Sequence, residues 1–307
     1  MVKKKFLGQA WSVNPLTTAL IAFIYFLAGY AGLWLAVPGT NVTPIWLPSG
    51  VALAAVILYG YPILFGVFLG SFLLNTYYLW QLLPFWGTLH ILIASAVTGI
   101  GASLQAAFGA FLIQHFIKGP WDHYQKRAGS VIKFLIIALI SCLINSTIGT
   151  LALTIEGFLP WELFPLVWRY WWIGDCTGVI VITPLIISWV RYPIKDWSIE
   201  RALEAIIILG GILLTALLNR TIHLPNPVPV YLYFPWLIWA AIRFQLLGAS
   251  FTLSYTIIIL YLNTISGYGG FVQSDINNSL LWLDLFIIIT APTVLSVGAA
   301  FTPLDEN

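Results

Sequence analysis

The acidic residue Asp175 stands inside a long apolar stretch, where a charged side chain is unusual. The segment 168–175 reads WRYWWIGD. In a helix, Trp171 and Trp172 share a face with Asp175, which lies about 18 Å along the predicted span at 1.5 Å per residue. A charge at such depth usually faces a bundle interior or a cavity and marks function. We therefore expect a sensing or switch site here, the alternative being a purely structural acid.

Asp175 needs a protonated state, a water-filled pocket or a partner on another helix. Arg169 is a poor partner, because six residues of helix turn it about 120° away. Arg243, in the segment WAAIRF at 239–244, is the best candidate for an ion pair with Asp175. The alternative is that Arg243 extends to the lipid headgroups at the nearer membrane surface.

Other polar and small residues interrupt the apolar runs. The polar ones are Asn75, Gln105 and Asn145. Each is expected to form an interhelical hydrogen bond more often than to bind a ligand. Two glycine pairs at helical spacing are Gly66 with Gly70, and Gly174 with Gly178. Such pairs let helix backbones approach closely, so we expect them to pack helices.

The sequence carries no pattern of an enzyme, metal or cofactor site. The four histidines lack metal-ligand spacing, and there is no nucleophile elbow or phosphate-binding loop. The cysteines Cys142 and Cys176 lie in apolar runs without a zinc or redox signature. No basic patch indicates nucleic acid. We expect a chain without catalytic activity or cofactor.

Composition places these residues in a membrane. The chain of 307 residues is 60% hydrophobic and only 8% charged, whereas soluble domains carry about 25% charged residues to keep their surface wetted. The apolar surface must therefore face lipid, and the apolar runs predict transmembrane helices. The fold class predicted is an all-α polytopic bundle of about ten spans, with eight as an alternative, in a single domain over 1–307.

The expected helices follow from the apolar runs and the breaks between them. They cover about 15–37, 45–60, 62–83, 87–117, 131–155, 163–190, 202–219, 229–246, 248–266 and 280–302. The second is short for a span of roughly 17 to 25 residues. Pro48 and Pro184 are expected to interrupt spans, most simply as kinks.

The distribution of Lys and Arg predicts the orientation, since cytoplasmic loops carry an excess of both. With the N-terminus inside, eleven of the thirteen basic residues are cytoplasmic, and only Arg169 and Arg220 lie towards the outside. The cytoplasmic set is Lys3, Lys4, Lys5, Lys118, Lys126, Arg127, Lys133, Arg191, Lys195, Arg201 and Arg243. We expect a multi-pass inner-membrane protein with both termini in the cytoplasm.

Four motifs in order resemble the type-one membrane-associated sensor (MASE) domain family of bacterial signalling proteins. They are WLPSGVALA at 46–54, Gly60 and Pro62 before GVFLGSFLLN at 66–75, WWIGD at 171–175 before TPL at 183–185, and Pro235 before WAAIRF at 239–244. The resemblance covers about 15–300, and its first motif adds Trp46 to the candidate sensing residues.

The resemblance implies a sensory input domain whose output partner is cytoplasmic, acting in cis or in trans. Histidine kinases and diguanylate cyclases are the usual outputs, which would place the chain in two-component or cyclic di-GMP signalling. No output domain is found before Asn307, so we expect a stand-alone sensor domain or part of a longer protein. The signal could be a ligand, another membrane protein or a bilayer property, and a homodimer is compatible with the sequence.

A small-molecule or ion transporter is the alternative function. Deep Asp and Arg residues and proline-broken spans suit one, because transport sites lie at the midplane on broken helices. Against it, no inverted repeat is visible and the spans carry few charges.

Overall fold

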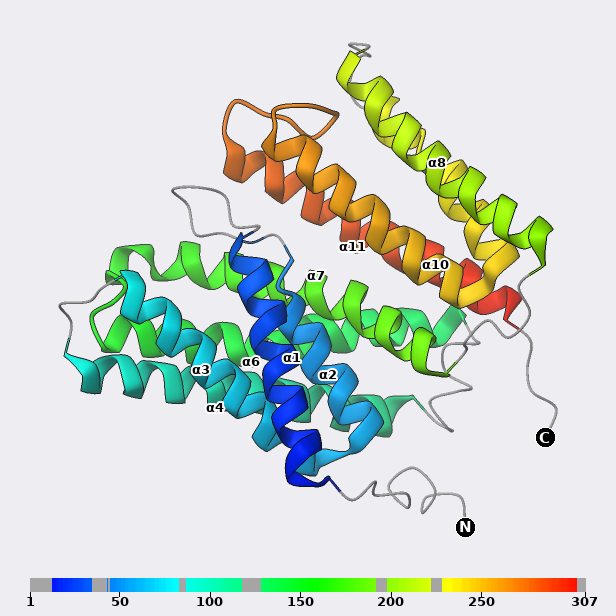
Figure 1. The fold of residues 1–307 in the computed structure, drawn as a ribbon. Coiled ribbons are helices and arrows are strands. Elements are labelled where there is room, and N and C mark those ends of the chain that lie inside the picture. Colours follow the sequence, from blue (N-terminus) through cyan, green and yellow to red (C-terminus); the bar gives the residue numbers. More distant parts are fainter. Residues whose placement is uncertain are drawn as a thin grey trace. The chain divides into compact units, whose positions relative to one another are not determined.

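The computed structural model of the chain is helical and contains no strand within the residues that it describes (Figure 1). These are 13–34, 43, 45–82, 87–117, 128–191, 198–221 and 228–302. Eight helices there are long and apolar enough to cross a membrane. The chain is therefore a multi-pass membrane protein, and the predicted all-α bundle is confirmed.

The helices fall into two compact units. The first, of residues 1–120 and 134–183, contains α1 (Pro15–Trp34), α2 (Leu47–Tyr59), η2 (Tyr61–Ile63), α3 (Leu64–Leu82) and α4 (Thr88–Phe116), most of α6 (Ala128–Ile155), η3 (Trp161–Leu163) and the first part of α7 (Phe164–Arg191). The second, of residues 121–133 and 184–307, contains the remainder of α6 and α7 with α8 (Ile199–Thr221), α9 (Val228–Tyr231), α10 (Phe234–Ile265) and α11 (Ile276–Phe301).

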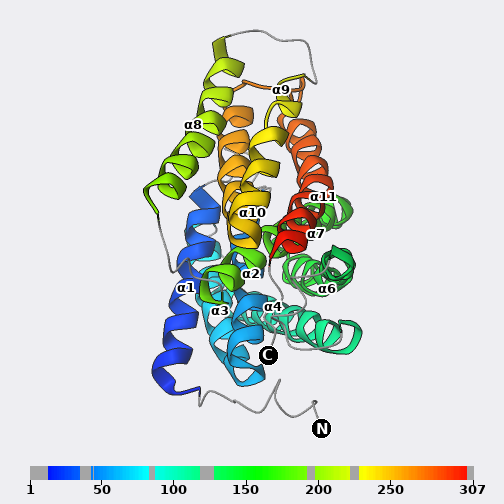
Figure 2. The same cartoon turned by 90° about the vertical axis from the view of Figure 1, so that its right-hand side faces the viewer.

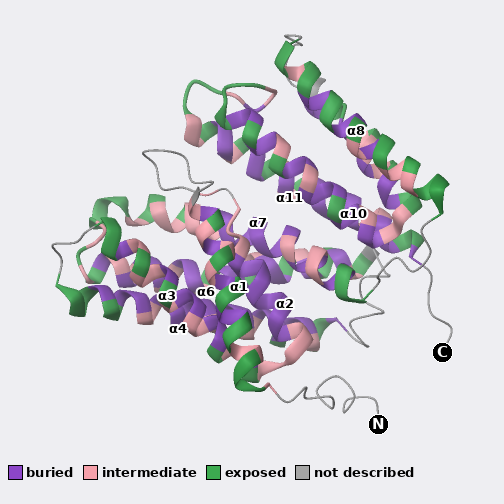
Figure 3. Cartoon of the chain, viewed as in Figure 1, coloured by how far each residue is buried: buried purple, intermediate pink, exposed green. Residues whose placement is uncertain are grey.

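Helix α2 is short because its sequence defines both ends. Pro48 occupies its first turn, where the missing N–H costs no hydrogen bond. Gly60 ends it with φ of +79°, a conformation that glycine adopts without strain. Residues 48–56 are all buried, so α2 forms part of the core of the first unit (Figure 3). Pro48 therefore starts a helix and does not interrupt one, whereas Pro184 lies inside the continuous helix α7.

The outer faces of the helices are apolar, as a lipid-facing surface requires. In α1 the side chains of Leu16, Leu20, Phe23 and Leu27 recur at helical spacing and are all exposed. On the opposite side of the same helix, Tyr25 is 2% exposed. The apolar residues thus cover both the core and the outer surface, which explains the low charge content.

Helix α10 consists of two arms joined by a sharp reversal at Gln245, whose φ is 57° and ψ −145°. A Cβ atom on Gly248 would lie 2.7 Å from the carbonyl oxygen of Ala240, although eight residues span about 12 Å of straight helix. Figure 2 shows the two arms side by side beneath α9. The N–H of Leu246, at the start of the second arm, donates to Thr302 Oγ1 at 3.3 Å.

The reversal accounts for the helices predicted at 229–246 and 248–266, which correspond to the two arms. The first arm, 234–244, and α2 are each shorter than a spanning helix. Among the described residues, eight helices are long enough to cross a membrane, the number given above as the alternative to ten.

Some residues used to predict the orientation lie outside the described part of the chain. They are Lys3, Lys4, Lys5, Lys118, Lys126, Arg127 and Lys195.

Candidate functional site: a buried carboxyl in the first unit

The side chain of Asp175 lies in the middle of α7 and is 2% exposed. Its Oδ1 accepts a hydrogen bond from Ser49 Oγ at 2.5 Å, and its Oδ2 accepts one from Asn145 Nδ2 at 3.1 Å. The side chain of Gln105 also hydrogen-bonds to the carboxyl. The carboxyl therefore joins α7 to α2, α6 and α4, and these three partners are neutral.

The position of Ser49 follows from the short length of α2. Ser49 is in the first turn of this helix, which begins beside the middle of α7. Backbone N–H groups at a helix N-terminus create a positive end that stabilises a nearby negative charge. The chain thus places a helix start and a hydroxyl donor against Asp175. Irregular backbone at such a depth is tolerated only where protein or a cavity surrounds it.

The glycines of α7 allow the entry to α2 to approach this closely. The N–H of Trp46 donates to the carbonyl oxygen of Gly174 at 2.9 Å. A Cβ atom on Gly178 would clash with the carbonyl oxygen of Trp46, and one on Gly50 would clash with that of Gly178. Two backbones are therefore in direct contact at Gly178, in the turn that follows Asp175.

The other glycine pair packs α3 against α1. A Cβ atom on Gly66 would lie 2.7 Å from the carbonyl oxygen of Thr18, and one on Gly70 would lie 2.7 Å from that of Ala22. This contact brings the polar side chains of α1 and α3 to the same interior.

A chain of polar contacts extends from the carboxyl site to α1 and α3. The hydroxyl of Tyr25 hydrogen-bonds with Trp46 and with Ser71. Asn75 Nδ2 donates to the carbonyl oxygen of Ser71 at 2.8 Å and to its hydroxyl at 3.3 Å. Trp46 and Asn75, both predicted site residues, thus belong to one polar interior with Asp175 and Asn145. We call the set Tyr25, Trp46, Ser49, Ser71, Asn75, Gln105, Asn145 and Asp175 the polar core.

The tryptophans near Asp175 connect α7 to α6. Trp172 Nε1 donates to the carbonyl oxygen of Leu139 at 2.9 Å, and Trp168 Nε1 donates to Thr147 Oγ1 at 3.0 Å. Trp171 packs on Gly149, where a Cβ atom would clash with its ring. These side chains attach α7 to α6, and the hydrogen bonds described for Trp168 and Trp172 go to α6 and not to the carboxyl.

The expected ion pair between Asp175 and Arg243 is wrong. Arg243 Nε donates to Glu204 Oε1 at 2.7 Å and to Oε2 at 2.9 Å, and Trp239 Nε1 donates to the same carboxyl at 2.6 Å. The physical reason is the reversal at Gln245, which lays the first arm of α10 along α8. Arg169 instead lies 5.6 Å over the ring of Tyr170.

Sequence reasoning missed three residues. Ser49 was visible only as part of the WLPSG motif. Glu204 follows Glu200 and Arg201 at the start of α8, and no motif in the sequence singles it out. Asp284, in α11, is 6% exposed, and its Oδ1 has no hydrogen-bond partner among the described residues. Its place between leucines in the last span was the signal that could have identified it.

Among the described residues, no three His, Cys, Asp or Glu side chains lie close enough together to hold a metal ion. What the polar core can do is exchange hydrogen bonds between helices. A small change in the position of α2 or α7 would remove a donor from a buried acceptor, which costs about 1–3 kcal/mol.

Comparison with known families gives a match over nearly the whole chain. The model of the MASE1 family matches residues 17–303, which include most of both compact units. No curated protein and no solved structure matches the sequence.

Replacing Gly178 with Ala should destabilise the first unit, because the new methyl group would meet the backbone of Trp46. We expect a loss of about 1–3 kcal/mol, as for overpacked cores, measured by denaturant unfolding in detergent. Gly129→Ala is the matched control, since its Cβ atom would meet nothing within 4 Å. Equal stability of the two variants would contradict the close approach.

Proposed function

Because the chain belongs to the MASE1 family of membrane sensor domains, we propose that it is a signal-input domain which controls a cytoplasmic output module. A histidine kinase or a diguanylate cyclase, in cis or in trans, is the kind of output that fits. The observation that supports this function most is the polar core, in which one buried acid connects four helices through neutral partners.

The polar core has the properties of a two-state packing element. Buried hydrogen bonds have strict geometry, so the packing of α2 against α7 has few satisfactory arrangements. A signal can shift the balance between two packings only by its different affinity for them. A ligand, a partner membrane protein or a change in the bilayer could each supply that difference. None of them requires a catalytic group in this chain.

Helix α7 provides a route for the change. It carries Asp175 in the first compact unit and continues without a break through Pro184 into the second. A shift of α7 at Asp175 would therefore be transmitted along a continuous helix. The second unit also contains α11, the last described helix, which ends at Phe301, ahead of the C-terminus to which an output module would connect in cis.

Substituting Asp175→Asn should change the output without preventing membrane insertion. Asn keeps the size of the side chain, but its amide nitrogen would face a donor from Ser49 or Asn145, which favours another packing. We expect basal kinase or cyclase activity of a full signalling protein to change at least threefold. The control is Asp275→Asn. It makes the same change at an acid outside the polar core, which caps α11 by accepting the N–H of Asn278. An unchanged output at normal expression would contradict the proposal.

We propose that the protein lies in the cytoplasmic membrane with both termini in the cytoplasm. The positive-inside distribution supports this orientation, and Arg243 and Glu204 bring two predicted inner ends together. A green fluorescent protein joined after Asn307 should fluoresce, whereas alkaline phosphatase joined there should be inactive. The reverse pattern would contradict the orientation.

A transporter is the second candidate, and discontinuous helices favour it. Helix α2 begins beside mid-α7 and α10 reverses at Gln245, and transport sites are often built from such breaks. Transport would be favoured over signal input if proteoliposomes with the unmodified chain accumulated a substrate and proteoliposomes with Asp175→Asn did not.

A further inference from the structure

The reversal in α10 places a glutamine where a chain normally uses glycine. Gln245 has φ of 57° and ψ of −145°, a conformation that residues with a Cβ atom rarely adopt. Every other residue with a positive φ in the described part of the chain is a glycine. Strained backbone persists only where the surrounding structure holds it, and such positions gather at functional and switch regions. The neighbours of Gln245 must therefore hold the reversal in place.

The last turn of α11 holds the peptide group that joins Gln245 to Leu246. The N–H of this group donates to Thr302 Oγ1 at 3.3 Å, and Thr302 is 8% exposed. The carbonyl oxygen of the same group faces Gly298, where a Cβ atom would lie 3.0 Å from it. The Thr302 hydroxyl donates in turn to the carbonyl oxygen of Gly298 at 2.8 Å. Both polar atoms of the strained peptide group are thus in contact with the end of α11.

The second arm of α10 contacts α7 just beyond the reversal. Ser250 Oγ lies 3.1 Å from Ser188 Oγ, and both serines are fully buried. Next to them, the rings of Phe251 and Trp189 pack edge to face with their centres 6.0 Å apart. All four residues belong to the second unit. A movement of this part of α7 would therefore reach the second arm less than two helical turns from Gln245.

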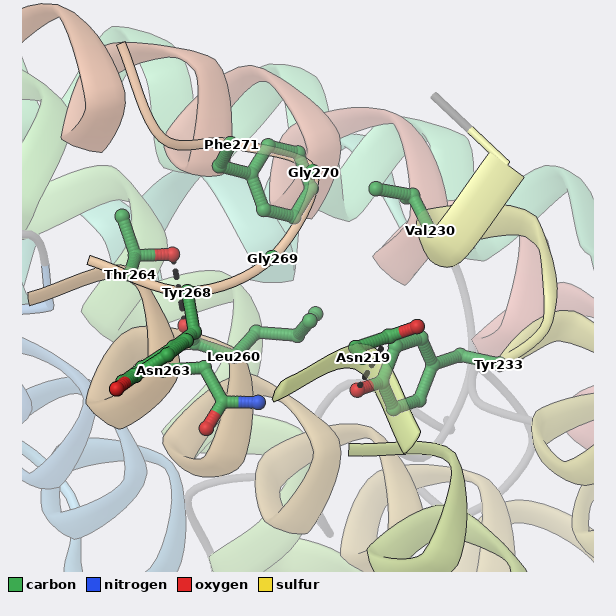
Figure 4. Close-up of a pocket in the computed structure, with 10 residues that line it drawn as sticks. All are labelled: Asn219, Val230, Tyr233, Leu260, Asn263, Thr264, Tyr268, Gly269, Gly270 and Phe271. Carbon is green, nitrogen blue, oxygen red and sulfur yellow. Dashed lines mark hydrogen bonds between the residues drawn. The ribbon is translucent and has the colours of Figure 1, made fainter. Parts of the chain in front are cut away.

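The opposite end of the two arms is fastened to α8. Asn263, about 27 Å along the second arm from Gln245 at 1.5 Å per residue, donates through Nδ2 to the carbonyl oxygen of Ala216 at 3.3 Å. Asn219 Nδ2 donates to the hydroxyl of Tyr233, which precedes the first arm, at 3.4 Å. Figure 4 shows Asn219, Tyr233 and Asn263 together at this end. Because this end is fixed, a displacement of the second arm is largest at the reversal.

We propose that the reversal at Gln245 is a latch that couples α7 to the end of α11. In the latched arrangement, Thr302 and Gly298 hold the strained peptide group. A shift of α7 would move the second arm through Ser250, draw the N–H of Leu246 away from Thr302 and let the reversal relax. The last turn of α11 would then be free to change position. The use of this latch to control an output module rests on the proposed function.

The first test removes the strain in the full chain in detergent. Gln245→Gly should raise the Tm by at least about 2 °C, although the same change inside an ordinary helix lowers stability. Hydrogen exchange of residues 296–302 should slow at least about fivefold, because the latched arrangement becomes more favourable. Gln245→Ala is the matched control, since it also removes the carboxamide but keeps the Cβ atom and its strain.

The second test loosens the latch from its other two sides. Thr302→Val keeps the shape of the side chain and removes the hydroxyl, so exchange of residues 243–250 should become at least about fivefold faster. Ser250→Ala should speed the exchange of residues 296–302. Ser254→Ala is its control and should not, because the Ser254 hydroxyl donates to the carbonyl oxygen of Ser250 within the same helix.

Three results would overturn the latch. They are a Tm of Gln245→Gly no higher than that of Gln245→Ala, an effect of Gln245→Gly that is confined to residues 243–250, and unchanged exchange at the end of α11 in Ser250→Ala. No output module takes part in these measurements, so such a failure leaves the proposed function to be judged by Asp175→Asn.

Discussion

A carboxyl group buried in the middle of a helix bundle must receive hydrogen bonds there, because an unpaired charge away from water is far too costly. Asp175 meets this requirement with Ser49, Asn145 and Gln105. Each of these donors comes from a different helix, so satisfying one acid fixes the mutual positions of α2, α4, α6 and α7. Much of the first unit follows from that constraint.

Bringing a donor to mid-α7 requires a helix that starts inside the bundle. Helix α2 does so because Pro48 suits a first turn and because Gly178 leaves room for the backbone of Trp46. Because the donor lies at the start of α2, the hydrogen bonds of Asp175 are sensitive to the position of that helix. A displacement of α2 would break a hydrogen bond at a buried site. The free energy of that bond would separate two packings of the helices, and a signal that binds them with different affinity would shift the balance between them.

The sequence was sufficient to predict the bundle, the approximate helix ends and a buried Asp175 in the middle of a helix, since these depend on local hydrophobicity and spacing. It could not predict partners, which depend on which helices become neighbours. Arg243 pairs with Glu204 because the chain reverses at Gln245, and no glycine or proline occupies that position to indicate a reversal. The role of Ser49 could not be predicted for a similar reason, because one hydroxyl in an apolar run does not indicate which acceptor it will bind.

The dependence of the first unit on the buried carboxyl can be measured directly with a double-mutant cycle. The free energy of unfolding would be compared for the unmodified chain, Ser49→Ala, Asp175→Asn and the double variant. Leaving a buried donor or acceptor without its partner costs about 1–3 kcal/mol, so we expect a coupling energy of at least about 1 kcal/mol. Additive effects, within about 0.5 kcal/mol, would show that the two side chains are independent and would contradict the central role of Asp175.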